Sequence, residues 1–202
     1  MPISINGSGT ITGISVGGLP DGIVDADMLA ANAVTAGKFA SGVRGKILQV
    51  VHVTKTDTAS TTSSSYSDVS GMAASITPSS TSSKIIVKFD IYAGGTSNVY
   101  GSAKCQRLIS GGSYADLQIA DVVGNHNRAN IAIDTEVSYG AYKGYSHSFS
   151  LQDTSHNTTS QITYKLVWKV TSGTAYINRN NIDAANTSTA GTSSVMLIEE
   201  AA

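Results

Sequence analysis

Apolar residues recur at every second position through much of the chain from residue 46 to residue 202. In one run, Ile85, Val87, Phe89 and Ile91 alternate with residues that include a lysine and an aspartate. Successive side chains of a β-strand point to opposite faces of its sheet, so this spacing predicts strands with one buried face. No segment after residue 46 repeats its apolar residues with the helical period. This part of the chain is therefore expected to fold through strands.

Ten segments of this region are predicted to be short strands, separated by clusters of Gly, Ser, Asn and Pro. Many short strands with regular turns predict a sandwich or a closed barrel. A stretch of about 155 residues buries enough surface to fold without a metal or disulfides. The strands are predicted at residues 47–56, 72–76, 85–91, 99–109, 115–122, 131–137, 147–151, 162–170, 175–178 and 194–199.

The predicted strand at residues 162–170 carries the only tryptophan of the chain. Lys165 and Lys169 fall on one face and are expected to reach solvent. The other face is therefore predicted to lie in the core, and it carries Tyr164, Leu166, Trp168 and Val170.

Charged residues make up 13% of the chain, and the formal net charge is -1. A nucleic-acid-binding protein needs a basic stripe that displaces counterions from phosphates, and an anionic membrane attracts polybasic segments. The sequence has neither feature, which excludes both classes of partner. Hydrophobic residues still account for 41%, so we expect a folded chain rather than a disordered one.

Cys105 is the only cysteine, so no disulfide can form within the chain, and its neighbours predict a packed thiol in a strand. The first residues contain neither the basic segment nor the apolar core of a secretion signal. No apolar run approaches the roughly 18 residues that a membrane helix requires. We therefore expect a soluble protein made in a reducing cytoplasm, with no membrane insertion.

The first 46 residues contain a short internal repeat, in which residues 24–30 are echoed by residues 34–40. Each copy has an aspartate or threonine that can cap a helix, followed by alanine-rich sequence, so each predicts a short helical turn. Turns this short cannot bury large apolar side chains by themselves. We therefore predict that Met28, Leu29 and Phe39 dock on a partner. A linker with scattered apolar residues is the alternative.

The sequence shows no catalytic constellation and no phosphate-binding glycine loop. Its four histidines lack the spacing of a metal site, although one histidine per subunit on a symmetry axis is an alternative. Glycan-degrading spikes use paired carboxylates, whereas the acidic residues here are scattered over separate segments. We predict no enzymatic activity, no metal and no cofactor. The acidic residues in question are Asp116, Asp121, Asp134, Glu136 and Asp153.

Three tyrosines, Tyr139, Tyr142 and Tyr145, are spaced three residues apart and separated by glycines. Tyrosine rings are rigid and amphipathic, and they present much contact area to sugar or protein surfaces. The spacing gives a hypothesis of receptor binding. Packing along a loop or a subunit interface is the alternative.

Several segments of the chain together form a recognisable pattern. They are residues 47–56, 59–72, 75–85, 164–179 and 195–199, with 18–40, which contains Leu-Pro-Asp-Gly and Val-Thr-Ala-Gly-Lys. The pattern resembles tail-fibre and virion structural proteins of tailed bacteriophages, especially marine ones, and 18–40 looks like the N-terminal connectors of such fibres. The resemblance implies a virion component, commonly a homotrimer, made in the cytoplasm of a bacterial host. It implies no particular ligand-contacting residues.

We therefore predict an all-β fold, with residues 1–46 as an N-terminal anchor with one or two small helical turns. Residues 47–202 are predicted to form an antiparallel β-sandwich head that is jelly-roll-like. The predicted function is a bacteriophage virion structural protein, a short tail fibre that docks through its N-terminus and turns its head to the host surface. A capsid decoration, cement or head-fibre protein is the alternative, and a glycan-degrading spike is a third possibility. Expected partners are two further copies of the chain, virion proteins of the tail or capsid, and a host-surface glycan or protein.

Overall fold

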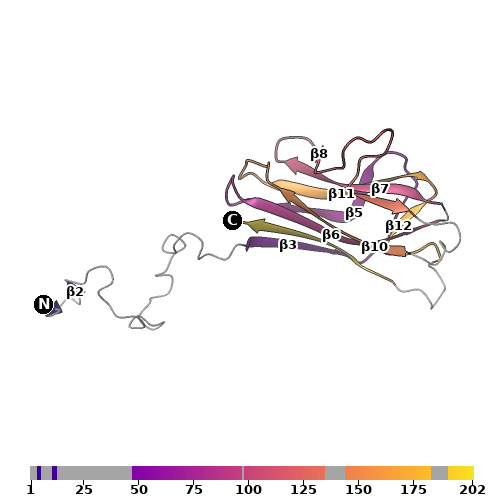
Figure 1. The fold of residues 1–202 in the computed structure, drawn as a ribbon. Coiled ribbons are helices and arrows are strands. Elements are labelled where there is room, and N and C mark those ends of the chain that lie inside the picture. The colour runs from indigo at the N-terminus through magenta and orange to yellow at the C-terminus, as the bar shows by residue number, and fades with distance from the viewer. Residues whose placement is uncertain (1–3, 6–10, 13–46, 97, 135–143, 183–190) are drawn as a thin grey trace. The chain divides into compact units, whose positions relative to one another are not determined.

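The computed structural model describes residues 4–5, 11–12, 47–96, 98–134, 144–182 and 191–202 (Figure 1). The chain divides into two compact units, Met1–Gly45 and Lys46–Ala202. In the first unit, β1 (Ser4–Ile5) and β2 (Ile11–Thr12) form an antiparallel pair. The helical turns predicted around Met28, Leu29 and Phe39 lie outside the described residues.

The second unit contains two antiparallel sheets, which lie in two layers (Figure 1). The first sheet places β3 (Ile47–Lys55), β13 (Ser194–Ala201), β6 (Lys84–Gly95) and β10 (Gly144–Asp153) side by side in that order. Two short strands, β12 (Ala175–Ile177) and β4 (Ala59–Thr61), extend it beyond the end of β13.

The second sheet places β5 (Ser67–Ile76), β11 (Ile162–Ser172), β7 (Tyr100–Ile109) and β9 (Ile131–Asp134) side by side. The two-residue β8 (Ala115–Asp116) pairs with the same edge of β7 as β9, further along the strand.

The order of these strands is that of a jelly roll. With the eight main strands numbered along the chain as β3, β5, β6, β7, β9, β10, β11 and β13, the first sheet runs first, eighth, third, sixth. The second sheet runs second, seventh, fourth, fifth. Two interlocked Greek keys of this kind define the jelly roll. The predicted antiparallel β-sandwich of jelly-roll type is confirmed.

The core lies between the sheets and contains the side chains that the alternation predicts. The four residues of the predicted inner face of β11 are all at most 2% exposed, including Trp168. From the first sheet, Phe89 on β6 stacks on Phe149 of β10, with ring centroids 4.9 Å apart. The Cys105 thiol is packed as predicted, and burial raises its pKa to about 12.

β6 and β10 extend beyond their predicted ends, and three further strands differ from their predictions. The segment predicted at 115–122 is a strand only at Ala115–Asp116, because Gln118 adopts a positive φ of 46° and turns the chain out of the sheet. β5 begins earlier than predicted, at Ser67, and Gly71 with φ 79° accompanies the irregular register between β5 and β11. β4 was not predicted, because its sequence, Ala-Ser-Thr, carries no apolar alternation.

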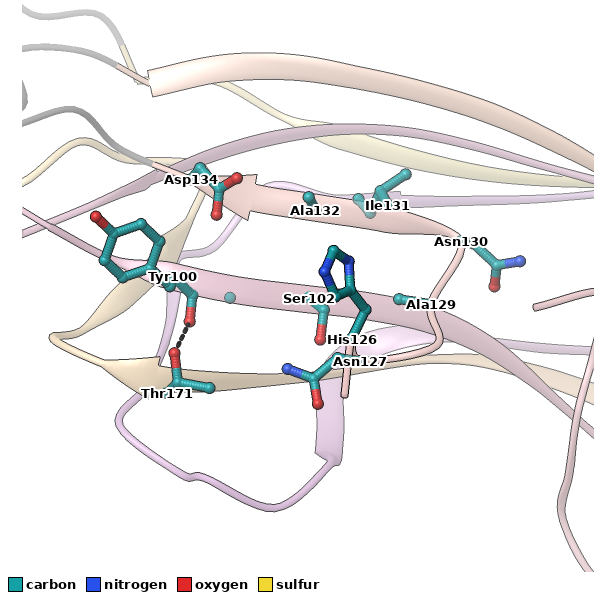
Figure 2. A pocket seen from close by; sticks show the side chains of 11 residues that line it. Tyr100, Ser102, His126, Asn127, Ala129, Asn130, Ile131, Ala132, Asp134 and Thr171 are labelled. Atoms are coloured by element: carbon teal, nitrogen blue, oxygen red, sulfur yellow. Dashed lines mark hydrogen bonds between the residues drawn. The ribbon is translucent and has the colours of Figure 1, made fainter. Parts of the chain in front are cut away.

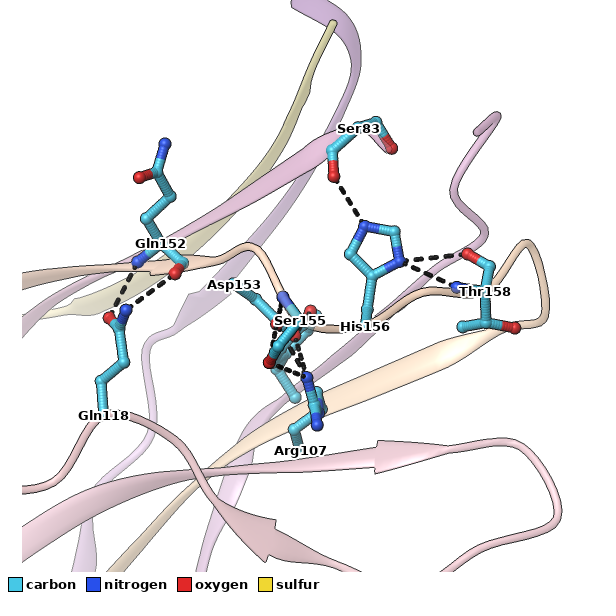
Figure 3. A network of polar contacts seen from close by, with 9 residues as sticks. Ser83, Arg107, Gln118, Gln152, Asp153, Ser155, His156 and Thr158 are labelled. Carbon is cyan, nitrogen blue, oxygen red and sulfur yellow. Dashed lines mark hydrogen bonds and ion pairs between the residues drawn. The ribbon is translucent and has the colours of Figure 1, made fainter. Parts of the chain in front are cut away.

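A buried carboxylate ties the two sheets together (Figure 3). Asp153 at the end of β10 is 1% exposed, and Nη1 of Arg107 on β7 lies 2.7 and 2.8 Å from its two oxygens. The hydroxyl of Tyr164 on β11 donates to the same carboxylate at 2.7 Å. Burial alone would raise the pKa of Asp153, but the hydrogen bonds from Arg107 and Tyr164 outweigh it and lower the pKa. The carboxylate is therefore held ionised between the sheets.

Glu200, on the inner face of β13, is a second buried carboxylate. One of its oxygens accepts hydrogen bonds of 2.7 Å from the backbone N and the Oγ of Ser79, and the other accepts one from the Gln49 amide. Burial alone would raise the pKa of Glu200, but these hydrogen bonds outweigh it and lower the pKa to about 2.

The free energy of unfolding is expected to fall as the pH drops from about 4.5 towards 2, and Glu200 should contribute to the fall. Its carboxyl titrates near 4.5 in the unfolded chain and near 2 in the fold. Between these values the unfolded chain binds more protons, so acid favours unfolding. In denaturant titrations, a Glu200→Gln variant should be less stable at pH 7 and show a shallower loss over this range. Equal slopes for the variant and the parent would show that Glu200 does not contribute.

Candidate functional site

The outer face of the second sheet carries a hollow of about 310 Å³ (Figure 2). It lies over the start of β7, beside the edge strand β9, and residues 126–130 of the preceding loop form one wall. A pocket of this volume falls within the range of small-ligand sites. Its lining consists of Tyr100, Gly101, Ser102, His126, Asn127, Ala129, Asn130, Ile131, Ala132, Asp134 and Thr171.

The register of β7 and β9 brings the main functional groups together. Tyr100 is the cross-strand partner of Asp134, and both side chains lie on the outer face because their inward-facing neighbour Ile133 is buried. Thr171 of β11 donates a hydrogen bond of 3.0 Å to the Tyr100 carbonyl oxygen. Figure 2 shows Tyr100 and Asp134 at one end of the hollow and His126 and Asn127 further along it.

The loop that walls the hollow is held by Asn130. The Asn130 Oδ1 accepts a hydrogen bond of 2.7 Å from the backbone N of Cys105, and its Nδ2 donates to the carbonyl oxygens of Leu117 and Gln118. Across the loop, Nε of Arg128 donates to the Ala120 carbonyl oxygen at 2.7 Å. The wall is therefore fixed by side-chain hydrogen bonds from within the loop.

The start of the same loop is tied to the other sheet by Gln118 (Figure 3). Its side-chain amide donates to the carbonyl oxygen of Gln152 on β10 at 2.8 Å and accepts from the Gln152 backbone N at 3.1 Å. This pairing satisfies backbone groups on β10, an edge strand of its sheet.

Tyr66, which lies between β4 and β5, links the floor of the hollow to its loop wall. Its hydroxyl lies 2.9 Å from Oγ of Ser102 and donates to the Arg128 carbonyl oxygen at 3.2 Å. The Lys104 ammonium lies over the Tyr66 ring, 4.0 Å from its centroid. Floor and wall are thus joined by contacts that do not involve a ligand.

A second hollow of about 480 Å³ adjoins the first, and both are lined by Ala132 and Asp134. Its remaining lining comes from the start of β10, where Tyr145 is 41% exposed. Burial lowers the pKa of His147, also in this hollow, and the negative charge of Asp134 opposes the shift. The two hollows therefore share one carboxylate, between β9 and β10.

The predicted site residues fall partly within this region. Tyr145 lies in the second hollow, whereas Tyr139 and Tyr142 lie outside the described residues, as do Met28, Leu29 and Phe39. Receptor binding by the three tyrosines therefore stays a prediction.

Sequence reasoning missed Tyr100 and Asp134 as a pair, because 34 positions separate them and only the β7–β9 pairing joins them. It also missed His156, whose Nε2 lies 2.7 Å from the Ser83 carbonyl oxygen and whose Nδ1 lies 3.1 Å from that of Thr158 (Figure 3). His156 is buried in a structural role away from the hollows.

No protein-family model and no curated protein matches the chain. Among solved structures, the chain is similar to the crystal structure of the infectious bursal disease virus VP2 subviral particle. The two share 12% sequence identity with a TM-score of 0.39, and the match covers 76% of this chain and 37% of the viral one. The chain is also similar to the structure of the Gx strain of that virus, with 9% identity and a TM-score of 0.40, covering 75% and 40%. The chain thus spans about two fifths of the length of these proteins. The jelly roll itself is established by the strand order.

Within residues 47–96, 98–134, 144–182 and 191–202 and the four N-terminal residues described, no three His, Cys, Asp or Glu side chains are grouped to hold a metal ion. In the same part of the chain, no helix is long and apolar enough to span a membrane.

Proposed function

We propose that this chain is a structural protein of a bacteriophage particle, in which the jelly-roll head is held on the particle through the N-terminal unit. The observation that carries the proposal is the strand order, because jelly rolls are a recurrent architecture of viral capsid and lectin domains. The resemblance of residues 18–40 and of several strand segments to phage virion proteins supports the same conclusion.

The filled interior of the sandwich favours a structural role over chemistry between the sheets. Jelly rolls of the cupin type also occur, and a ligand inside the sandwich needs space there. Here Trp168, Tyr164, Phe89 and Met72 are fully buried between the sheets. The first hollow lies on the outer face of the second sheet and the second opens at the edge between β9 and β10, so a binding partner can reach both.

On the particle, we propose a capsid decoration or head-fibre protein, since the fold is one that viral shells use. A short tail fibre is the second candidate, because the sequence segments resemble tail-fibre proteins. In either position we propose a homotrimer, with the N-terminal unit contacting other virion proteins and the head facing outward.

The N-terminal repeat tests this proposal. Replacing Met28, Leu29 and Phe39 together with serine should leave the head folded and trimeric but remove the protein from particles. Burying each of these side chains contributes roughly 1.5–3 kcal/mol. Three N-terminal units of one trimer that bind together have a higher overall affinity for the particle than a single unit has. The measurement is the abundance of the protein in purified virions relative to the major capsid protein, with antibody labelling to locate it on capsid or tail.

The matched control replaces Val122 and Val123 on the head with serine, since these apolar side chains are 71% and 62% exposed. This variant should enter particles at the parental ratio. If the triple N-terminal variant also does so, the anchor lies elsewhere. If its trimer dissociates in solution, the repeat is a trimerisation element, and docking through it is wrong. Absence of the parental protein from virions would reject the proposed function itself.

A further inference from the structure

We propose that the two adjoining hollows form one groove that binds a neutral oligosaccharide, with Tyr100 and Tyr145 contacting sugar rings and Asp134 accepting hydrogen bonds between them. The site is inferred from the head alone. The biological source of the ligand, a glycan of the bacterial surface, rests on the proposed function. The groove consists of the residues that line the first and second hollows described above.

The charges of the described lining residues disfavour anionic ligands. No lysine or arginine is among the described residues that line either hollow, and Asp134 contributes a carboxylate to both. The lowered pKa of His147 keeps this ring neutral at pH 7. Phosphate and sulfate groups are held by cations or by arginine forks. The electrostatics therefore favour a ligand without phosphate, sulfate or carboxylate.

The polar groups of the groove match hydroxyl groups. An ionised carboxylate only accepts hydrogen bonds, whereas an asparagine amide both donates and accepts. Asp134 and Asn127 therefore satisfy both the donor and the acceptor roles of sugar hydroxyls. Apolar ligands are disfavoured, because they would bury these groups without partners.

The exposed tyrosines supply the apolar part of such a site. Tyr100 is 57% exposed at the first hollow and Tyr145 is 41% exposed at the second. A tyrosine ring offers a rigid apolar face with a polar tip and loses little rotamer freedom on binding. An ammonium ligand is held by a cage of several aromatic faces, whereas the described residues that line each hollow include one tyrosine. The arrangement fits the alternating apolar and hydroxyl surfaces of a sugar chain.

The loop wall of the first hollow is held in place by the protein itself. Asn130 and Arg128 brace the loop that walls it, and Gln118 ties that loop to β10. Walls that are already fixed need no further ordering on binding, which removes part of the entropic cost. A shallow site can therefore bind a flexible glycan.

The test measures binding of the purified full chain to a printed array of oligosaccharides released from bacterial capsules and lipopolysaccharides. The neutral oligosaccharide that binds most strongly is then titrated by calorimetry. Tyr100→Ala and Asp134→Asn should each weaken binding at least about tenfold. Tyr145→Ala should weaken binding of the oligosaccharide but not of a single sugar that occupies the first hollow. Two matched controls on the same head, Tyr114→Ala and Asp121→Asn, should bind as the parent does.

Three outcomes would overturn the proposal: no neutral glycan on the array binds, binding is insensitive to Tyr100 and Asp134, or the controls weaken binding equally. Light scattering and melting temperatures accompany each variant. If Tyr100→Ala changes the oligomeric state instead, the groove is an interface between copies and the glycan site is wrong. The abundance of the Tyr100 and Asp134 variants in virions should be normal, so failure of glycan binding is distinguishable from failure of the proposed function.

Discussion

Replacing Trp168 with alanine is expected to lower the free energy of unfolding by about 3–5 kcal/mol. Trp168 is 2% exposed at the centre of β11, which pairs with β5 on one side and β7 on the other. The substitution removes the largest side chain of the core and leaves a cavity. The cavity cannot close, because β11 is hydrogen-bonded to β5 and β7 on its two sides. For a unit of this size the melting temperature should fall by roughly 6–20 °C. Equilibrium denaturation of the parent and the variant measures the difference.

Tyr100→Ala is the matched control for this measurement, because it also removes a large aromatic ring from the second sheet. The Tyr100 ring is 57% exposed, so its loss should change the free energy of unfolding by less than about 0.5 kcal/mol. If the two variants prove equally stable, the inner face of β11 is not packed as described.

Replacing Asp153 with asparagine should cost about 3 kcal/mol. Removing one partner of a buried ion pair leaves the other charge uncompensated, at a cost of about 3–5 kcal/mol. The lower end applies here, since the Arg107 side chain is 19% exposed and retains some water. The amide that replaces the carboxylate has one acceptor oxygen instead of two, so one of the donors Arg107, Tyr164 and Ser155 would lose its partner. Denaturant titration at pH 7 gives the free-energy difference.

Asp116→Asn is the control for Asp153, since Asp116 also pairs with a basic residue of β7 but has a side chain 28% exposed. Exposed pairs contribute up to about 1 kcal/mol, so this variant should remain close to the parent. In a double-mutant cycle, Arg107→Met should cost less in the Asp153→Asn background than in the parent. Additive costs would mean that the two residues do not interact across the sheets.

The strands themselves were largely predictable, since the pleat of a strand is a local property. The alternation of Ile85, Val87, Phe89 and Ile91 identified β6 and its buried face, and the core face of β11 was identified in the same way. Prediction was wrong at residues 115–122, where the strand ends at Asp116. Gln118 turns the chain out of the sheet, and Asn130 binds the carbonyl oxygens of Leu117 and Gln118 at that turn.

The candidate site was barely predictable. Tyr145 was singled out for its spacing, but the residues that it shares a hollow with come from another strand. Asp134 was noted only as one of several scattered acidic residues. His126 and Asn127 belong to a polar loop whose sequence gives no sign of the hydrogen bonds that fix it.

The sequence by itself determined most of the strands described within residues 47–202, the buried faces of those strands, and the packed thiol of Cys105, because side-chain periodicity depends only on neighbouring residues. Only the tertiary structure decided which strands pair within the predicted jelly roll, the Arg107–Asp153 ion pair and the meeting of Tyr100 with Asp134. Each of these depends on which strands pair, and many pairings of similar alternating strands satisfy the same local pattern. The choice among them is made by packing and hydrogen bonding between residues far apart in the chain, when both sheets close over one core.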